Sequence, residues 1–209
     1  HVLQVVVVAN MLEQIKSYID GLSVDSIYAT RQRELVSLAE IIKKEKDQNG
    51  AVNLNFICTH NSRRSQFAQT WAQTIAAYVG FSVDCYSGGV EVTECNLRTI
   101  NALQTTGFEV TQVGEQNPRY QLRFSDDSEQ VTLFSKLHSD NSNPDRFLAI
   151  MTCDHADQNC PFIPNAVARF SLTYVDPKRS DGTSSESETY LNTSALIATE
   201  MKFLFSQLQ

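Results

Sequence analysis

The sequence predicts an α/β fold with a mostly parallel central sheet that is flanked by helices. From residue 51 onward, short apolar segments alternate with helical ones, which is the order that a parallel sheet with crossover helices requires. Two of the apolar segments run directly into a cysteine, Cys58 and Cys153, and a third precedes Asp176 and a proline. Ligand sites of parallel sheets lie beyond the carboxyl ends of the strands. The chemistry is therefore expected where these three residues meet.

Length and charge narrow the classes of protein that fit. The chain has 209 residues, enough for one well-buried domain. Its net charge is -7, and acidic and basic residues are interspersed, so we expect no cationic face for nucleic acid or for an anionic membrane. The apolar run in residues 1–10 is too short to cross a bilayer, and it lacks a basic leader and a cleavage site. We give these residues no functional weight and expect a cytoplasmic protein.

An N-terminal extension, residues 1–50, precedes the predicted catalytic domain, residues 51–209. Within residues 11–48, apolar side chains at helical spacing predict two helices with a break near residues 23–29. The residues that carry this pattern are Leu12, Ile15, Ile19 and Leu22, then Leu35, Leu38, Ile41 and Ile42. This pattern is typical of a helical hairpin.

The catalytic domain begins with a strand at residues 52–57 and a helix that Gly80 ends. A β-rich segment at 81–87 and a helix at 96–106 follow. Alternating runs at 120–124 and 131–134 predict a β-hairpin insertion within about residues 109–145. Strands at 147–152 and 170–174 and a helix at 186–208 complete the domain.

Residues 58–65, CTHNSRRS, join the first strand to the next helix, and we call them the oxyanion loop. Backbone N–H groups and a helix N-terminus in such a turn bind phosphate-like anions, and Arg64 adds a planar fork. The same positive potential stabilises a thiolate, so Cys58 is the expected nucleophile. Ser65 is placed to hydrogen-bond its sulfur. The expected oxyanion-binding residues are Thr59, His60, Asn61, Ser62, Arg63 and Ser65.

The segment FICTHNSRRSQ resembles the phosphate loop of the superfamily of low-molecular-weight protein tyrosine phosphatases and thioredoxin-coupled arsenate reductases. The resemblance covers residues 52–107 and 146–209. It implies that Asp176, in its Asp-Pro pair, is the general acid that protonates the leaving oxygen while Cys58 attacks.

A second segment, MTCDHADQNCPFIP at residues 151–164, is similar to the redox segment of the arsenate reductases. The similarity implies that Cys153 attacks the cysteine–arsenic adduct and releases arsenite, and that Cys160 then resolves the disulfide. Arsenate reduction with a thioredoxin-type reductant is the leading hypothesis. We expect no tightly bound cofactor, and phosphate, sulfate or arsenate in the oxyanion loop.

Other functions remain open at this point. The same loop and Asp176 suit a phosphatase that hydrolyses phosphomonoesters through a phosphocysteine. A non-catalytic oxyanion-binding or redox-sensing module is a third hypothesis, although it leaves Asp176 without a role. Alternatively, one of Cys153 and Cys160 is a buried core thiol and the other a zinc ligand with Asp154 and His155, but a second ligand pair is lacking, so we predict no metal site.

Five cysteines at irregular spacing argue against a disulfide framework, and Cys85 and Cys95 are interpreted as core or surface thiols. Three residues depart from the pattern of the family. Arg63 stands where alanine or cysteine is common, and Gln69 stands where reductases with a potassium site have glutamate. Lys178 stands where the tyrosine phosphatases have an aromatic residue. Gln69 therefore argues against a potassium site, and Lys178 against phosphotyrosine.

Overall fold

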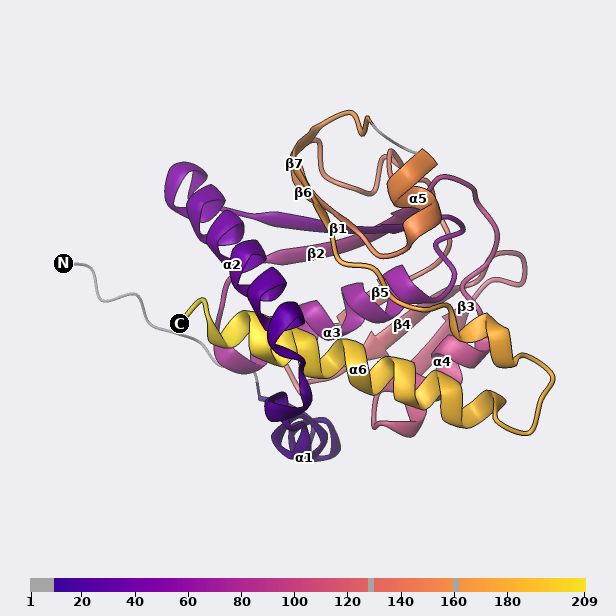
Figure 1. Ribbon diagram of the computed structural model, residues 1–209. Helices are drawn as coiled ribbons and strands as arrows, with labels where there is room; N and C mark the ends of the chain where they lie inside the picture. Colours follow the sequence, from indigo (N-terminus) through magenta and orange to yellow (C-terminus); the bar gives the residue numbers. More distant parts are fainter. Residues whose placement is uncertain (1–9, 128–129, 160–161) are drawn as a thin grey trace.

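A four-stranded parallel sheet forms the centre of the protein (Figure 1), seen in a computed structural model that describes residues 10–127, 130–159 and 162–209. Its strand order is β2-β1-β6-β7. The strands are β1 (Asn53–Cys58), β2 (Asp84–Gly89), β3 (Glu109–Val113), β4 (Arg119–Arg123), β5 (Gln130–Leu133), β6 (Phe147–Met151) and β7 (Ala166–Ser171). The helices are α1 (Glu13–Gly21), α2 (Ala29–Asn49), α3 (Arg64–Val79), α4 (Leu97–Thr105), α5 (Asp154–Asn159) and α6 (Glu186–Ser206), with short 3-10 helices η1 (Val24–Ser26) and η2 (Pro177–Ser180). The predicted α/β class is confirmed.

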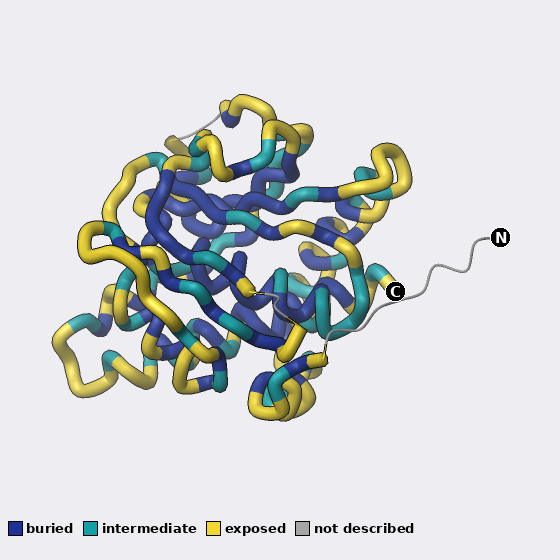
Figure 2. The backbone as a smooth tube through the Cα atoms, turned by 180° about the vertical axis from the view of Figure 1, so that it is seen from behind, coloured by how far each residue is buried: buried dark blue, intermediate teal, exposed yellow. Residues whose placement is uncertain are grey.

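Helices cover both faces of the sheet because successive side chains of a strand point to opposite faces. Leu54 and Phe56 of β1 face the larger core, together with α3 and α6, whereas Ile57 faces a smaller cluster under α5. Viewed from behind, the central strands are mostly buried (Figure 2). Such double coverage explains why β6 has the continuous apolar sequence FLAIM.

The carboxyl ends of the strands bring distant residues to one edge. β1 ends at Cys58, and the N–H of Thr152, just after β6, donates to the carbonyl of Ile57 at 2.7 Å. Cys153 follows Thr152 directly, so two cysteines lie at neighbouring strand ends. The segment after β7 leads along the same edge to Asp176.

The N-terminal extension packs against the rest of the molecule. α1 and α2, separated by η1 as expected, lie against α6 on the face seen in Figure 1. Their inward side chains are fully buried in the same core as Trp71; they are Ile15, Ile19, Leu35, Leu38 and Ile42. The helical hairpin is therefore continuous with the catalytic core.

The insertion forms a three-stranded antiparallel sheet in the order β3-β4-β5. The predicted hairpin corresponds to β4 and β5. β3 was not predicted, because four of its five residues are exposed and it lacks a buried alternating face.

Two further elements differ from the expectation. β7 ends at Ser171, whereas the predicted strand ran to residue 174; beyond β7 the chain keeps two backbone hydrogen bonds, from Leu172 N–H to Met151 and from Tyr174 N–H to Thr152. Helix α5 was not predicted, because its sequence DHADQN is polar and short.

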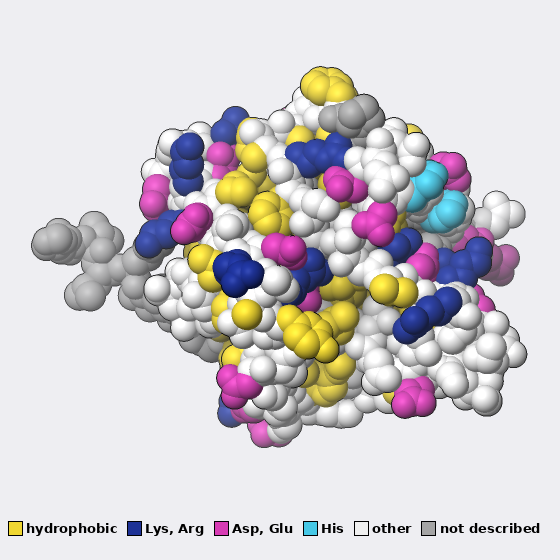
Figure 3. Space-filling model, viewed as in Figure 1, with side chains coloured by type: hydrophobic (Ala, Val, Ile, Leu, Met, Phe, Trp, Pro, Cys, Tyr) yellow, Lys and Arg dark blue, Asp and Glu magenta, His cyan; other side chains and the backbone are white. Residues whose placement is uncertain are grey.

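The surface agrees with the mixed charge of the sequence. On the face in Figure 3, basic and acidic side chains are interspersed. No helix among the described residues is long and apolar enough to cross a bilayer.

Candidate active site

The oxyanion loop turns sharply between β1 and α3. Cys58, which is 3% exposed, ends the strand, and Arg64 begins the helix. Asn61 adopts a left-handed conformation with φ of 48°, a region that asparagine tolerates better than most residues. The first N–H groups of α3 have no partner within the helix. The loop therefore has the geometry of an anion-binding turn.

A chain of hydrogen bonds orients Ser65 toward the nucleophile. The backbone N–H of Lys136 donates to Asn61 Oδ1 at 3.0 Å, and Asn61 Nδ2 donates to Ser65 Oγ at 2.9 Å. Ser65 Oγ lies 3.0 Å from Cys58 Sγ. Because Ser65 accepts from Asn61, its own hydroxyl hydrogen is free to donate to the sulfur. The Ser65 hydroxyl is thereby held against the sulfur of Cys58.

Arg64 connects the oxyanion loop to Asp176. Its Nη2 lies 2.7 Å from Asp176 Oδ2, and its Nη1 donates to the carbonyl of Tyr174 at 3.1 Å. Asp176 Oδ1 also accepts a hydrogen bond from the backbone N–H of Lys178 at 3.0 Å. This bond caps the N-terminus of η2. An oxyanion in the loop would thus meet the same guanidinium that holds Asp176. The fold brings together two residues that are 112 positions apart.

Cys153 lies beside the oxyanion loop. Thr59 Oγ1 is 3.5 Å from Cys153 Sγ and 3.2 Å from His155 Nδ1. Cys153 is 1% exposed, belongs to the same buried cluster as Cys58, and accepts a hydrogen bond from the N–H of Ala156. Cys153 therefore contacts the loop at Thr59, the residue after Cys58. Cys160, the other expected redox residue, lies outside the described residues.

The side chains of three expected oxyanion-binding residues point to other partners. Arg63 Nε donates to Tyr190 Oη at 2.8 Å, and Arg63 Nη2 lies 3.6 Å from Asp181. Ser62 Oγ donates to the carbonyl of Glu94, and His60 Nε2 lies 3.3 Å from Glu91 Oε2. These three residues would therefore bind an oxyanion through their backbone N–H groups and not through their side chains.

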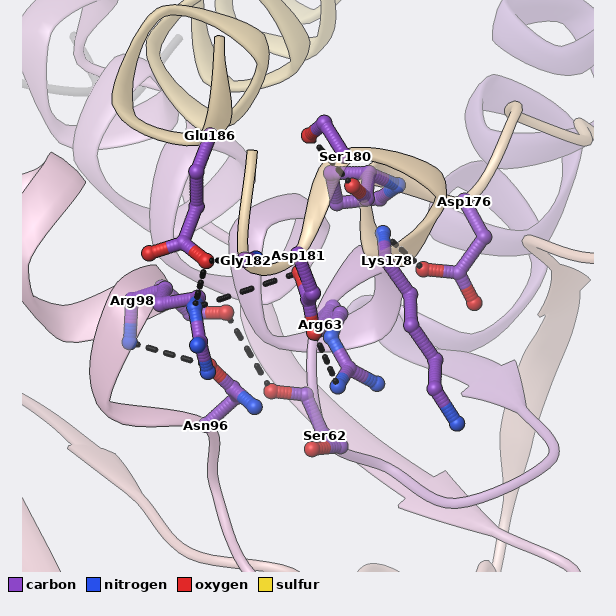
Figure 4. Close-up of polar contacts among 12 residues, drawn as sticks. Ser62, Arg63, Asn96, Arg98, Asp176, Lys178, Ser180, Asp181, Gly182 and Glu186 are labelled. Carbon is purple, nitrogen blue, oxygen red and sulfur yellow. Dashed lines mark hydrogen bonds and ion pairs between the residues drawn. The ribbon is translucent and has the colours of Figure 1, made fainter. Parts of the chain in front are cut away.

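Arg63 belongs to a charged cluster that joins the loop to η2 and α6. Asp181 lies between Arg63 and Arg98, and its Oδ1 is 3.9 Å from Arg98 Nε (Figure 4). Arg98 Nε also pairs with Glu186 Oε2 at 2.8 Å. In the same view Lys178 extends alongside Arg63 without a drawn contact at its ammonium group. The bulky residue at position 63 therefore has a structural role, which its charge alone did not indicate.

The insertion stabilises the oxyanion loop from the other side. Ser135 Oγ donates to the carbonyl of His60 at 2.8 Å, and Gln66 Nε2 donates to the carbonyls of Asn61 and Phe134 at 2.7 and 2.9 Å. These contacts were not predicted, because residues 134–136 form no motif and touch the loop only through the tertiary fold. The only sequence signal was the length of the insertion.

Two further cysteines, Cys85 and Cys95, belong to the described part of the chain. Cys85 and Cys95 are buried in the larger core, and burial raises the pKa of both thiols, so both stay protonated at neutral pH. Gln69, an uncharged residue, accepts a hydrogen bond from Ser87 at 2.6 Å. Among the residues that the structure describes, no three His, Cys, Asp or Glu side chains are grouped to hold a metal ion.

A cleft of about 700 Å³ opens next to the loop. His60, Ser62 and Arg63 line it on the loop side, Lys178 on the η2 side, and Pro118 and Tyr120 on the side of the insertion. The cleft has room for a group much larger than a tetrahedral oxyanion.

Comparison with known proteins identifies relatives of the chain. No protein-family model matches it. Arsenate reductase 2 of Staphylococcus epidermidis is 30% identical over 122 residues, which are 58% of this chain and 76% of that protein. An arsenate reductase of Staphylococcus aureus is 32% identical over 122 residues, with the same coverage of 58% and 76%.

Solved structures show the same fold at lower identity. A low-molecular-weight phosphotyrosine phosphatase from Vibrio cholerae has a TM-score of 0.51 at 15% identity and covers 75% of this chain and 95% of its own. A low-molecular-weight protein tyrosine phosphatase from Bacillus subtilis also has a TM-score of 0.51, at 17% identity, and covers 75% and 97%. The chain thus belongs to the superfamily of low-molecular-weight protein tyrosine phosphatases and arsenate reductases, and it is an enzyme with a cysteine-dependent mechanism.

Proposed function

We propose that the chain reduces arsenate to arsenite. In the first step, the oxyanion loop and Arg64 bind arsenate, and the Cys58 thiolate attacks arsenic. An arsenic–oxygen bond breaks, and Asp176 supplies the proton with which that oxygen leaves as water. The product is a Cys58–arsenate adduct in which arsenic is still pentavalent.

Two thiols then supply the two electrons. The Cys153 thiolate attacks Cys58 Sγ, the sulfur–arsenic bond breaks, and its electron pair stays on arsenic, which leaves as arsenite. Cys160 next attacks Cys153, releases the Cys58 thiolate and forms the Cys153–Cys160 disulfide. A thioredoxin-type dithiol protein reduces this disulfide and completes the cycle. Because the cycle needs reduced thiols, we assign it to the cytoplasm.

The proximity of Cys153 to the oxyanion loop is the observation that carries the proposal. Phosphomonoester hydrolysis needs only the nucleophilic cysteine, since water opens its intermediate. Here a second thiol is buried beside Thr59, at 3.5 Å from its hydroxyl, and accepts an N–H hydrogen bond from α5. A Cys58–Cys153 disulfide at this buried position would be shielded from a protein reductant. Cys160 is therefore needed to transfer the disulfide to a position that the reductant can reach.

The second candidate function is phosphatase activity, and the cleft beside the loop favours it. Arsenate would be held within the loop, whereas the organic group of a phosphomonoester could extend from the loop into the adjoining cleft of about 700 Å³. Phosphate and arsenate have nearly the same shape, so the loop alone does not distinguish them.

The decisive experiment is arsenate-dependent NADPH consumption in the presence of thioredoxin and thioredoxin reductase. The unsubstituted protein is compared with Cys58→Ser, Cys153→Ser and Cys160→Ser. Cys85→Ala is the matched control, since this thiol is buried and lies beside Leu54, away from Cys58. We expect turnover in the unsubstituted protein and the control and none in the three variants.

Two results would change the assignment. Hydrolysis of an aryl phosphate that needs Cys58 but survives loss of Cys153 and Cys160, without arsenate turnover, would establish the phosphatase. Thiol oxidation without either turnover would support the sensor hypothesis.

A further inference from the structure

Arg31, near the start of α2 in the N-terminal extension, reaches the segment that carries Asp176. Its Nη2 donates to the carbonyl of Thr173 at 2.9 Å, and its Nε donates to Glu200 Oε1 at 2.9 Å. Its Nη1 pairs with Glu34 at 2.8 Å. The Arg31 side chain is 19% exposed and that of Glu200 only 4%, so the Arg31–Glu200 pair is largely withdrawn from water. All three donor nitrogens of the guanidinium are engaged.

Glu200 and Arg31 also hold the neighbouring residue, Tyr174. The Tyr174 hydroxyl donates to Glu200 Oε2 at 2.7 Å, and the Arg31 guanidinium carbon lies 5.0 Å from the centre of the Tyr174 ring. Burial raises the pKa of Tyr174, so the hydroxyl keeps its proton and remains a donor. The backbone and the side chain of residues 173–174 are both fixed to α2 and α6.

The opposite side of this segment touches the oxyanion loop. The next carbonyl, that of Tyr174, accepts from Arg64 Nη1 at 3.1 Å, and Arg64 Nη2 contacts Asp176. Two guanidinium groups therefore bind successive carbonyls. Residues 172–176 have no regular secondary structure, and Val175, between Tyr174 and Asp176, is 67% exposed. The backbone hydrogen bonds of Leu172 and Tyr174 tie the start of this segment to the end of β6, and side-chain anchors hold the rest of the path to Asp176.

We infer that Arg31 is a positioning residue that fixes the Asp176 segment against the oxyanion loop, so that the N-terminal extension is part of the catalytic apparatus. The inference rests on the proposed role of Asp176 as the proton donor. Arg31 acts on the reaction through Asp176 and does not touch the oxyanion. Proton transfer depends steeply on the position of the donor, so loss of this anchor lowers the rate more than the affinity for the anion.

A double-substitution cycle in the full chain tests the inference. Arg31→Met keeps the aliphatic stem and removes the guanidinium, Asp176→Asn removes the proton donor, and the third variant combines both. Glu34→Gln is the matched control, because it removes only the partly exposed partner of Arg31. For each protein, kcat and KM for arsenate, the Kd for inorganic phosphate and the thermal unfolding curve are measured.

We expect Arg31→Met to lower kcat by about tenfold or more and to leave the phosphate Kd within about threefold, whereas Glu34→Gln matches the unsubstituted protein. In the Asp176→Asn background, Arg31→Met should have no further effect on kcat. Arg31→Lys restores one donor and should recover part of the rate. If Arg31→Met folds poorly, Tyr174→Phe serves in the same cycle, because it removes only the hydroxyl bond to Glu200.

The inference is overturned if Arg31→Met leaves kcat unchanged, or if it lowers kcat by the same factor with and without Asp176. If the unsubstituted protein reduces no arsenate but hydrolyses an aryl phosphate, the proposed reduction fails, and the same cycle with the phosphate ester still decides the role of Arg31. Absence of both activities in the unsubstituted protein would overturn the proposed function and this inference together.

Discussion

Lys136 lies directly behind the oxyanion loop with only 5% of its surface exposed. Its ammonium group donates to Ser142 Oγ at 3.2 Å and lies 5.0 Å from the centre of the Phe134 ring. Burial lowers the pKa of Lys136 to about 8; the charge of Asp140 partly offsets this effect, and Arg119 adds to it. The charged form is thus less stable in the folded chain than in the unfolded one.

We predict that Lys136→Met stabilises the protein at neutral pH. Between pH 8 and 10.5, the unfolded chain holds a proton that the folded chain has lost, so the free energy of unfolding of the unsubstituted protein rises with pH across this window. The penalty present below pH 8 is about 3 kcal/mol. Urea unfolding at a series of pH values should show the advantage of Lys136→Met at pH 7 shrinking toward pH 10.5.

An exposed lysine serves as the control for Lys136→Met. Lys43→Met removes an exposed ammonium group and should leave the free energy of unfolding nearly constant relative to the unsubstituted protein. A difference between Lys136→Met and the unsubstituted protein that does not vary with pH would contradict the prediction.

At the scale of residues, the sequence singled out the candidate reactive groups but not the residues that support them. Cys58 and Arg64 lie in one short segment whose pattern indicates an anion-binding turn, whereas the roles of Cys153 and Asp176 follow from the resemblance to the family. The positions of Ser135, Lys136 and Arg31 depend on contacts between segments 70 or more residues apart. No local pattern indicates such contacts.

The insertion is the element whose function is clearest from its contacts. Ser135, just after β5, donates to the carbonyl of His60 and accepts from the N–H of Thr93 at 2.8 Å each. The end of the insertion therefore joins the oxyanion loop to the segment that follows β2.

We predict that Ser135→Ala weakens oxyanion binding. Loss of these hydrogen bonds costs about 1 kcal/mol of loop stability, which corresponds to a roughly fivefold higher Kd for inorganic phosphate. Titration calorimetry measures the Kd directly. Ser139→Ala, an exposed serine four residues further on, is the control and should bind phosphate normally. Equal affinities in the two variants would show that the insertion does not support the loop.

Elements with a strong apolar period were predicted with nearly correct bounds, and polar ones were not. Helix α3 and the strands β1 and β6 have buried patterns that the sequence displays. β3 is mostly exposed and forms by pairing with β4, and α5 is short and polar. Tertiary context decided these elements.

The whole molecule has one large core that includes the N-terminal extension. Leu38 of α2 is fully buried and shares this core with Trp71 of α3 and Met201 of α6. The sequence predicted an added hairpin beside a catalytic domain. The apolar pattern of each helix shows which face is buried but not which other element covers it, so the shared core could not be predicted.

We predict that Leu38→Ala lowers the free energy of unfolding of the entire protein by about 2 to 5 kcal/mol. Because the core is continuous, far-ultraviolet circular dichroism and phosphate binding should be lost together in one transition. Leu196→Ala, an apolar residue of α6 that is 49% exposed, should have little effect. Two separate transitions, with phosphate binding surviving the first, would mean that the extension folds independently.

The relay of thiols is the central claim, and trapping its disulfides tests it most directly. The reduced protein is mixed with one equivalent of arsenate without a reductant, alkylated, digested and examined by mass spectrometry, and arsenite is quantified. The account predicts one equivalent of arsenite, a Cys153–Cys160 disulfide in the unsubstituted protein, and a Cys58–Cys153 disulfide in Cys160→Ser. Unchanged arsenate with all cysteines alkylated, or a disulfide that joins Cys58 to Cys95 instead, would contradict it.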